Sequence, residues 1–159
     1  MKIRIEFGAA RSACDCEQCV NYCHIVPGYL IPADLTRLIP PDTDPFQWAE
    51  EHLLASPGAT VIQGGIIRRI PTLVPARAAH GGCHFLSESR RCTVHANAPF
   101  GCAFFGCQSG READALSAKG LEAIEFDREN TGLYTQLWHH LDGCGLLAIP
   151  PEVARRAIA

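Results

Sequence analysis

Charged residues and long apolar runs are both scarce in this chain. Only 19% of its 159 residues are charged and 47% are hydrophobic, which excludes a disordered protein and allows a sizeable core. The formal charge of -3 argues against a surface for nucleic acid. No apolar run approaches the length of a transmembrane helix, so we expect neither nucleic acid nor a membrane among the partners.

Recognised catalytic and nucleotide-binding motifs are missing as well. The sequence has no phosphate-binding loop and no dinucleotide fingerprint, and its spacing assigns no Ser-His-Asp or Cys-His catalytic set. The first eight residues alternate charged with apolar side chains and lack the apolar core of a signal peptide. We therefore expect a cytoplasmic location, and the sequence leaves open whether the protein is an enzyme.

Cysteine, in contrast, is abundant, with nine residues in the chain. Disulfides are rare in a reducing cytoplasm, and pairing an odd number of thiols leaves one over. Metal binding or redox chemistry therefore explains the cysteines better than disulfide bonds do.

Local signals predict an α+β fold in a single domain, residues 1–159. Asp44 is a typical N-cap residue, Pro45 follows it at the first helical position, and we expect this helix to end at Ser56-Pro57-Gly58. Gly64-Gly65 between two apolar runs predicts a tight hairpin with a primed turn. The other expected elements are a helix over 33–39, hairpin strands over 60–63 and 66–70 extended by 72–74, a second hairpin joining 83–86 to 92–94, and helices over 109–124, 133–141 and 152–158.

Composition divides the chain into two regions. Residues 14–107 form a cysteine-cluster metal-binding region, and residues 109–159 form a helical C-terminal region. Residues 10–29 show neither a helical nor a strand period, so we expect loop or short turns there.

The spacing of the cysteines indicates a metal site. Cys16 and Cys19 form a C-x2-C pair, which lets two thiolates wrap around one metal, and a closed site normally draws its four ligands from two segments. The predicted metal ligands are Cys16, Cys19, Cys23, Cys83, Cys92, Cys102 and Cys107. Thiolates suit zinc and iron–sulfur clusters alike, so the expected cofactor is zinc or iron, including a [4Fe–4S] cluster. Whether there are one or two sites stays open.

Several other residues are alternatives. Cys14 is an even choice, because Cys16 can take the same role, and we expect Cys144 to be a lone surface or packing thiol. His24, His84 and His95 are weaker ligand candidates, since each is more often an ordinary packed residue. Twelve of the fourteen basic residues are Arg; they form a solvated face, offset thiolate charge, or bind an anionic partner.

Five segments place the cysteines in a recognisable order. These segments are Cys16-x2-Cys19-x2-Tyr22-Cys23, Pro32-Ala33-Asp34-Leu35-Thr36-Arg37-Leu38, Gly82-Cys83-His84-Phe85-Leu86, Cys92-Thr93-Val94-His95, and Ala98-Pro99-Phe100-Gly101-Cys102 with Phe104-Phe105-Gly106-Cys107. The order resembles the YkgJ-like CxxCxxCC cysteine-cluster family, described as zinc- or iron-chelating domains. The chain departs from that pattern at Tyr22 (Cys in the family), His95 (Tyr), and Ala98 and Ala103 (both Arg).

Three functions follow as hypotheses. The favoured one is a metal-binding module in which the thiolates organise a loop-rich half of the chain. The second is an iron–sulfur-dependent enzyme that modifies a protein or a small molecule, because some proteins with this type of cluster resemble lysine methylases acting on flagellin. The third is a metal-stapled module that binds a protein partner.

Overall fold

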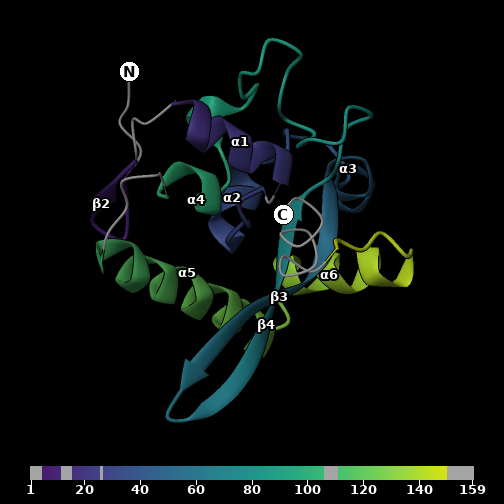
Figure 1. Ribbon diagram of the computed structural model, residues 1–159. Helices are drawn as coiled ribbons and strands as arrows, with labels where there is room; N and C mark the ends of the chain where they lie inside the picture. Colours follow the sequence, from purple (N-terminus) through teal and green to yellow (C-terminus); the bar gives the residue numbers. More distant parts are fainter. Residues whose placement is uncertain (1–4, 12–15, 26, 106–110, 150–159) are drawn as a thin grey trace.

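Six α-helices, two antiparallel hairpins and one short 3-10 helix make up the part of the chain that the computed structural model describes, residues 5–11, 16–25, 27–105 and 111–149. This is the α+β fold that the sequence predicts. Figure 1 shows the long hairpin of β3 and β4 with α5 and α6 beside it. The shorter helices α1, α2 and α4 are gathered at the end of the molecule opposite the hairpin turn.

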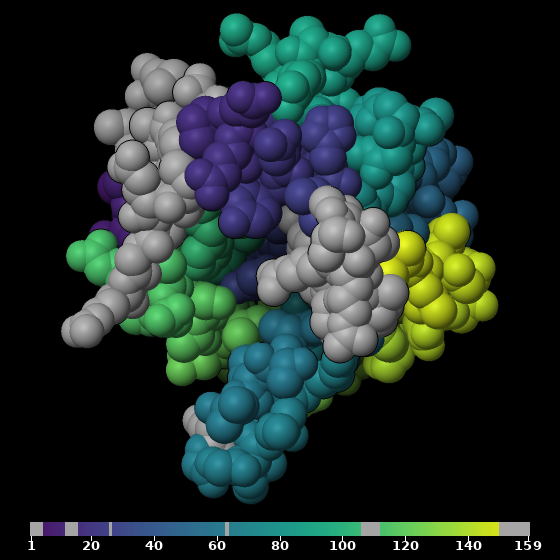
Figure 2. All heavy atoms as spheres, in the orientation of Figure 1, coloured from purple at the N-terminus to yellow at the C-terminus, as the bar shows by residue number. Residues whose placement is uncertain are grey.

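The long hairpin has the predicted turn. β3 (Leu53–Gln63) pairs with β4 (Ile66–Pro75), and Gln63 faces Ile66 across the turn. Gly64 and Gly65 both have positive φ, 58° and 77°, which a primed two-residue turn requires and which glycine adopts without strain. The extension over residues 72–74 is confirmed as part of β4. The turn end of the hairpin stands out from the body of the molecule in Figure 2.

The helix after Asp44 starts as predicted but ends earlier. α3 (Pro45–His52) begins with the Asp44 carboxylate accepting a hydrogen bond from the backbone N–H of Phe46 at 2.9 Å. The predicted stop at Ser56-Pro57-Gly58 is wrong, because β3 starts at Leu53 and runs through these residues, with a shift of register between Ser56 and Ala59. Leu53 is fully buried, so pairing with β4 and burial outweigh its helical periodicity.

Two further helices are confirmed and complete the apolar core. α5 (Arg111–Glu129) and α6 (Leu133–Gly143) pack against each other and against the long hairpin. Tyr134 of α6 is buried, and its hydroxyl donates to the carbonyl of Leu30 at 2.6 Å and accepts from the N–H of Leu73 at 2.7 Å. This side chain therefore joins three parts of the chain that are far apart in the sequence.

A buried carboxylate joins the core to the cysteine region. Asp34 lies in α2 (Pro32–Leu38), close to the predicted bounds of that helix, and is fully buried. Its Oδ2 accepts from the N–H of Ile31 and from the N–H of Phe100, both at 2.9 Å. Phe100 begins α4 (Phe100–Ala103). Both hydrogen bonds offset the cost of burying the charge.

Two predictions for the cysteine region are wrong. Residues 10–29 are not only loop, since they hold the end of a short hairpin, β1 (Ile5–Glu6) with β2 (Ala9–Ala10), and the helix α1 (Glu17–Ile25). The expected second hairpin is reduced to an isolated bridge between Leu86 and Cys92, followed by η1 (His95–Asn97). The expected helix over 152–158 and the start of the helix at residue 109 lie outside the described residues.

Candidate metal site

Five of the seven predicted ligands line one cavity of about 760 Å³. They come from three segments that are far apart in the sequence: Cys19 and Cys23 from α1, Cys83 and Cys92 from the turns after β4, and Cys102 from α4. Cys16 precedes α1, is exposed, and is not among the lining residues. Cys107 lies outside the described residues, as does Cys14.

Helix α1 brings Cys19 and Cys23 to the same side. Residues four apart lie one above the other on a helix, so both thiols face the cavity. Arg77 holds the C-terminal end of α1, where its guanidinium donates to the carbonyls of His24 and Ile25, both at 2.6 Å. A cation at this end also complements the helix dipole.

Backbone hydrogen bonds place Cys83 and Cys92. The N–H of Cys83 donates to the carbonyl of Cys23 at 2.8 Å, which ties this segment directly to α1. Arg77 pairs with Cys83 in an antiparallel bridge, and Leu86 pairs in the same way with Cys92. Each of these cysteines is therefore anchored by main-chain contacts although it lies outside any named helix or strand.

Close contact between two glycines places Cys102. A Cβ on Gly28 would lie 2.2 Å from the carbonyl carbon of Gly101 and 2.4 Å from the nitrogen of Cys102, so only glycine fits there. The N–H of Gly101 donates to the carbonyl of Tyr29 at 2.9 Å. The N–H of Gly28 donates to the sulfur of Cys102 at 3.2 Å, an arrangement that stabilises a thiolate.

Burial favours the protonated thiol at four of these cysteines, because it raises the pKa of Cys23, Cys83, Cys92 and Cys102. Burial is the main reason that the pKa of Cys83 rises to about 12, and the nearby Cys23 and Cys92 add repulsion. Burial also raises the pKa of Cys23, with further repulsion from Cys92 and Cys19. The pKa of Cys102 rises well above its ordinary value, through burial and then through Cys83 and Cys23. These thiols therefore act on one another across the cavity, and a bound cation would favour their ionised forms.

Arg11, Arg90, Arg91 and His95 also line the cavity. The three arginines are close enough to the thiols to offset thiolate charge, which is one of the alternatives that the sequence leaves open. Nη2 of Arg11 lies 2.9 Å from Nδ1 of His95, and Arg90 donates to the side-chain oxygen of Asn21 at 3.0 Å.

The other two candidate histidines lie elsewhere. His24 and His84 are not among the residues that line the cavity. The ring of His84 instead packs edge-on to the ring of His52, with a centroid separation of 4.9 Å.

Sequence reasoning missed the roles of residues other than cysteine that hold the thiols in position. Arg77 and Gly28 have no local motif, because their roles depend on segments more than 50 residues away. It also treated Cys144 as a lone thiol, whereas its sulfur lies 3.8 Å from Nε2 of His140. The spacing His140-x3-Cys144, at the end of the helix expected over 133–141, is the signal available for that pair.

No protein-family model, curated protein or solved structure matches this chain. The resemblance to the YkgJ-like proteins therefore stays a prediction. Among the described helices, none combines the length and apolar character needed to cross a membrane.

Proposed function

We propose that the chain is a metal-binding cysteine-cluster protein whose cavity holds zinc or iron through thiolates. The observation that carries the proposal is that Cys19, Cys23, Cys83, Cys92 and Cys102 line a single cavity. Four ligands complete a tetrahedral zinc site or hold a [4Fe–4S] cluster, so the five thiols include enough donors for either. The order of the cysteines, which resembles that of the YkgJ-like proteins, supports the same function.

The spacing of the thiols favours a cluster over a single ion. In a tetrahedral zinc site with Zn–S bonds of about 2.3 Å, the sulfurs lie about 3.8 Å apart. Among the described residues, no three cysteine sulfurs lie within 4.8 Å of one another. In a [4Fe–4S] cluster each thiolate binds a different iron, so wider spacing is expected.

An iron–sulfur-dependent enzyme is the second candidate. Its support is the combination of thiols with Arg11, Arg90 and Arg91 on the wall of the same cavity. Arginine favours carboxylate and phosphate groups, so the cavity suits an anionic substrate or co-ligand next to the metal. No base or nucleophile is assigned to this candidate.

The test is anaerobic purification followed by an absorption spectrum and elemental analysis. We expect a brown protein that absorbs near ~400 nm, from charge transfer between thiolate and iron, and that contains iron and sulfide. A Cys23→Ser variant should lose the colour, while Cys144→Ser, outside the cavity, should keep it. A colourless protein with zinc would assign the zinc form instead. A chain that folds normally in chelator and carries no metal would overturn the proposal.

A further inference from the structure

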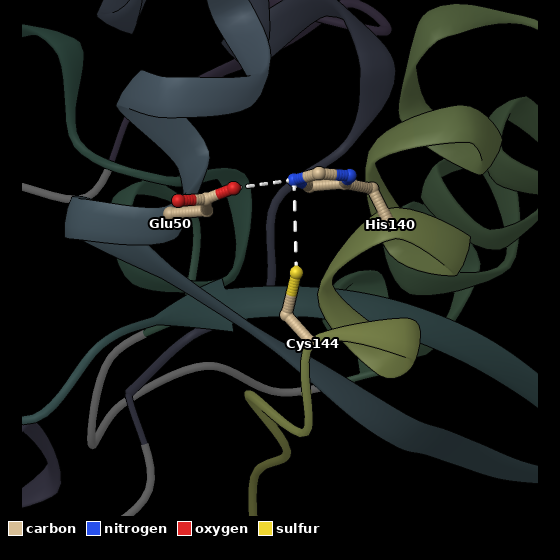
Figure 3. A group of neighbouring side chains, drawn as sticks. All are labelled: Glu50, His140 and Cys144. Atoms are coloured by element: carbon tan, nitrogen blue, oxygen red, sulfur yellow. Dashed lines mark hydrogen bonds and ion pairs between the residues drawn. The ribbon is translucent and has the colours of Figure 1, made fainter.

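A second group of metal-ligating side chains lies outside the cysteine cavity. Glu50 of α3 and His140 of α6 point toward each other, and Cys144, the residue that caps α6, points toward the same place (Figure 3). Nε2 of His140 lies 2.6 Å from Oε1 of Glu50 and 3.8 Å from Sγ of Cys144. The three ligand atoms all lie within 4.8 Å of one another, and none of these residues lines the cavity described above.

The two helices hold this group in place. His140 and Cys144 are one turn apart, so their side chains share a face of α6. On α3, Phe46 and Glu50 are related in the same way, and α3 packs against α6. The ring of Phe46 packs edge-on against the imidazole of His140, with a centroid separation of 5.2 Å. The imidazole is therefore oriented by packing as well as by its polar partner.

The arrangement does not suit a Cys-His-Glu catalytic relay. In such a relay the thiol and the carboxylate bond to different ring nitrogens, so that one activates the nucleophile while the other orients the ring. Here the thiol and the carboxylate both approach the same atom, Nε2 of His140. A single nitrogen with one proton or one lone pair cannot serve both, but three donor atoms that lie within 4.8 Å of one another can bind the same cation.

We propose that Glu50, His140 and Cys144 form a mononuclear site for a borderline-soft divalent cation such as Zn²⁺. Sulfur, imidazole nitrogen and carboxylate oxygen are the three ligand types that zinc takes in proteins, and three protein ligands leave a fourth position open to water or to another donor. Such an open position distinguishes this site from the proposed thiolate site, which is closed by protein sulfur.

The observed distances need only a small adjustment. Zn–N and Zn–S bonds of about 2.1 and 2.3 Å at a tetrahedral angle separate nitrogen from sulfur by about 3.6 Å, close to the 3.8 Å found here. The nitrogen and oxygen ligands would stand about 3.4 Å apart, so the Glu50 carboxylate must retreat by about 0.8 Å from its hydrogen-bonded position. The Glu50 side chain is 44% exposed, which leaves it room to do so.

Cadmium NMR on the reduced 159-residue protein tests the site, because the chemical shift of the metal reports how many sulfurs bind it. With Cd²⁺ alone as the probe, we expect one signal from a site with a single sulfur ligand. Cys144→Ser should abolish this signal. In competition with a chromogenic chelator, Glu50→Gln should weaken Zn²⁺ binding at this site at least ~10-fold. The matched controls are Glu51→Gln and His139→Ala, which change the neighbouring residue on each helix and should leave both readouts unchanged.

The outcomes separate this site from the cavity. A signal from several sulfurs that depends on Cys23 but not on Cys144 belongs to the proposed function. Absence of the single-sulfur signal, its survival in Cys144→Ser, or equal loss in Glu51→Gln and Glu50→Gln would overturn the second site and leave the first untouched. Circular dichroism of each variant checks that the helices are intact.

Discussion

Two parts of this molecule are held together in different ways. The apolar half comprises β3, β4, α5 and α6, and the cysteine half comprises α1, residues 76–99 and α4. Around α6 and the long hairpin, Leu53, Leu73 and Leu137 are completely buried, and burial of this kind stabilises a fold by roughly 1.5–3 kcal/mol per side chain. Around the cysteine cavity, residues 87–97 are exposed or half-buried and form turns with an isolated bridge and η1. We expect the first half to stay folded through its apolar core and the second half to need a metal.

Removal of the metal should separate the halves most clearly. Binding at structural thiolate sites contributes apparent free energies on the order of 10 kcal/mol. After chelation we expect faster amide hydrogen exchange in α1 and in residues 76–99, with little change in α6 and in β3 and β4. Hydrogen exchange followed by mass spectrometry measures this region by region. Equal protection with and without chelator would mean that the cysteine half does not depend on metal.

Replacing Asp34 should break the link between the halves. Asp34→Ala leaves the N–H groups of Ile31 and Phe100 without their acceptor, and a loss of about 3–5 kcal/mol in the free energy of unfolding is expected when a buried charged partner is removed. Urea unfolding gives the value. Glu122→Ala, at an exposed position of α5, is the control and should change stability by less than about 0.5 kcal/mol. Similar losses in both variants would contradict the role of Asp34.

Tyr134→Phe should weaken the apolar half alone. The variant removes one hydroxyl that bonds to Leu30 and Leu73, so we expect a loss of about 2 kcal/mol in unfolding free energy. Metal content should not change, because Tyr134 does not line the cavity. Tyr22→Phe, at an exposed residue, is the matched control for stability. A drop in bound metal in Tyr134→Phe would show that the halves are more tightly coupled than this comparison holds.

The smallest effect should come from pH, with opposite signs in the two metal states. The pKa of Cys83 rises from 9.0 to about 12 on folding without metal, so the protonated thiol favours the folded state below pH 9. That stability is lost between pH 9 and 12 at about 1.4 kcal/mol per pH unit, so about 1.4 kcal/mol is lost by pH 10. Metal binding requires deprotonated thiols, so affinity rises with pH. Melting temperatures of chelated and metal-loaded protein should therefore diverge from pH 8 to pH 10, and a constant difference would contradict the prediction.

The parts of the fold that rest on local chemistry could be predicted from the sequence. Asp44 marks the start of α3 through its own hydrogen bond, and Gly64-Gly65 specify the hairpin turn through their backbone freedom. The spacing of Leu133, Leu137 and Leu141 predicts α6 in the same local way. Each of these signals acts within a few residues, so long-range packing did not override it.

The predictions of secondary structure are wrong where one spacing of residues is compatible with two different structures. Cys16, Cys19 and Cys23 follow helical spacing as well as the spacing of a metal knuckle, and only the second meaning was used, so α1 was missed. Leu53 and Leu54 continue the helical face of α3, yet their pairing with Pro75 and Val74 places them in β3. All five cysteines that line the cavity are among the seven predicted ligands. The sequence leaves open which of the seven come together, because their positions depend on contacts such as that of Arg77 with the carbonyls of His24 and Ile25, which no local pattern encodes.

The contact between Gly28 and Gly101 has a consequence for recognising relatives of this chain. Because each glycine excludes a side chain on the other, neither position can change alone without moving Cys102. The pair therefore forms a sequence fingerprint: a glycine shortly after the first cysteine helix, and a second glycine directly before the cysteine of α4. A distant chain that keeps both glycines and the order of the cysteines should build the same cavity, even where its other residues have diverged.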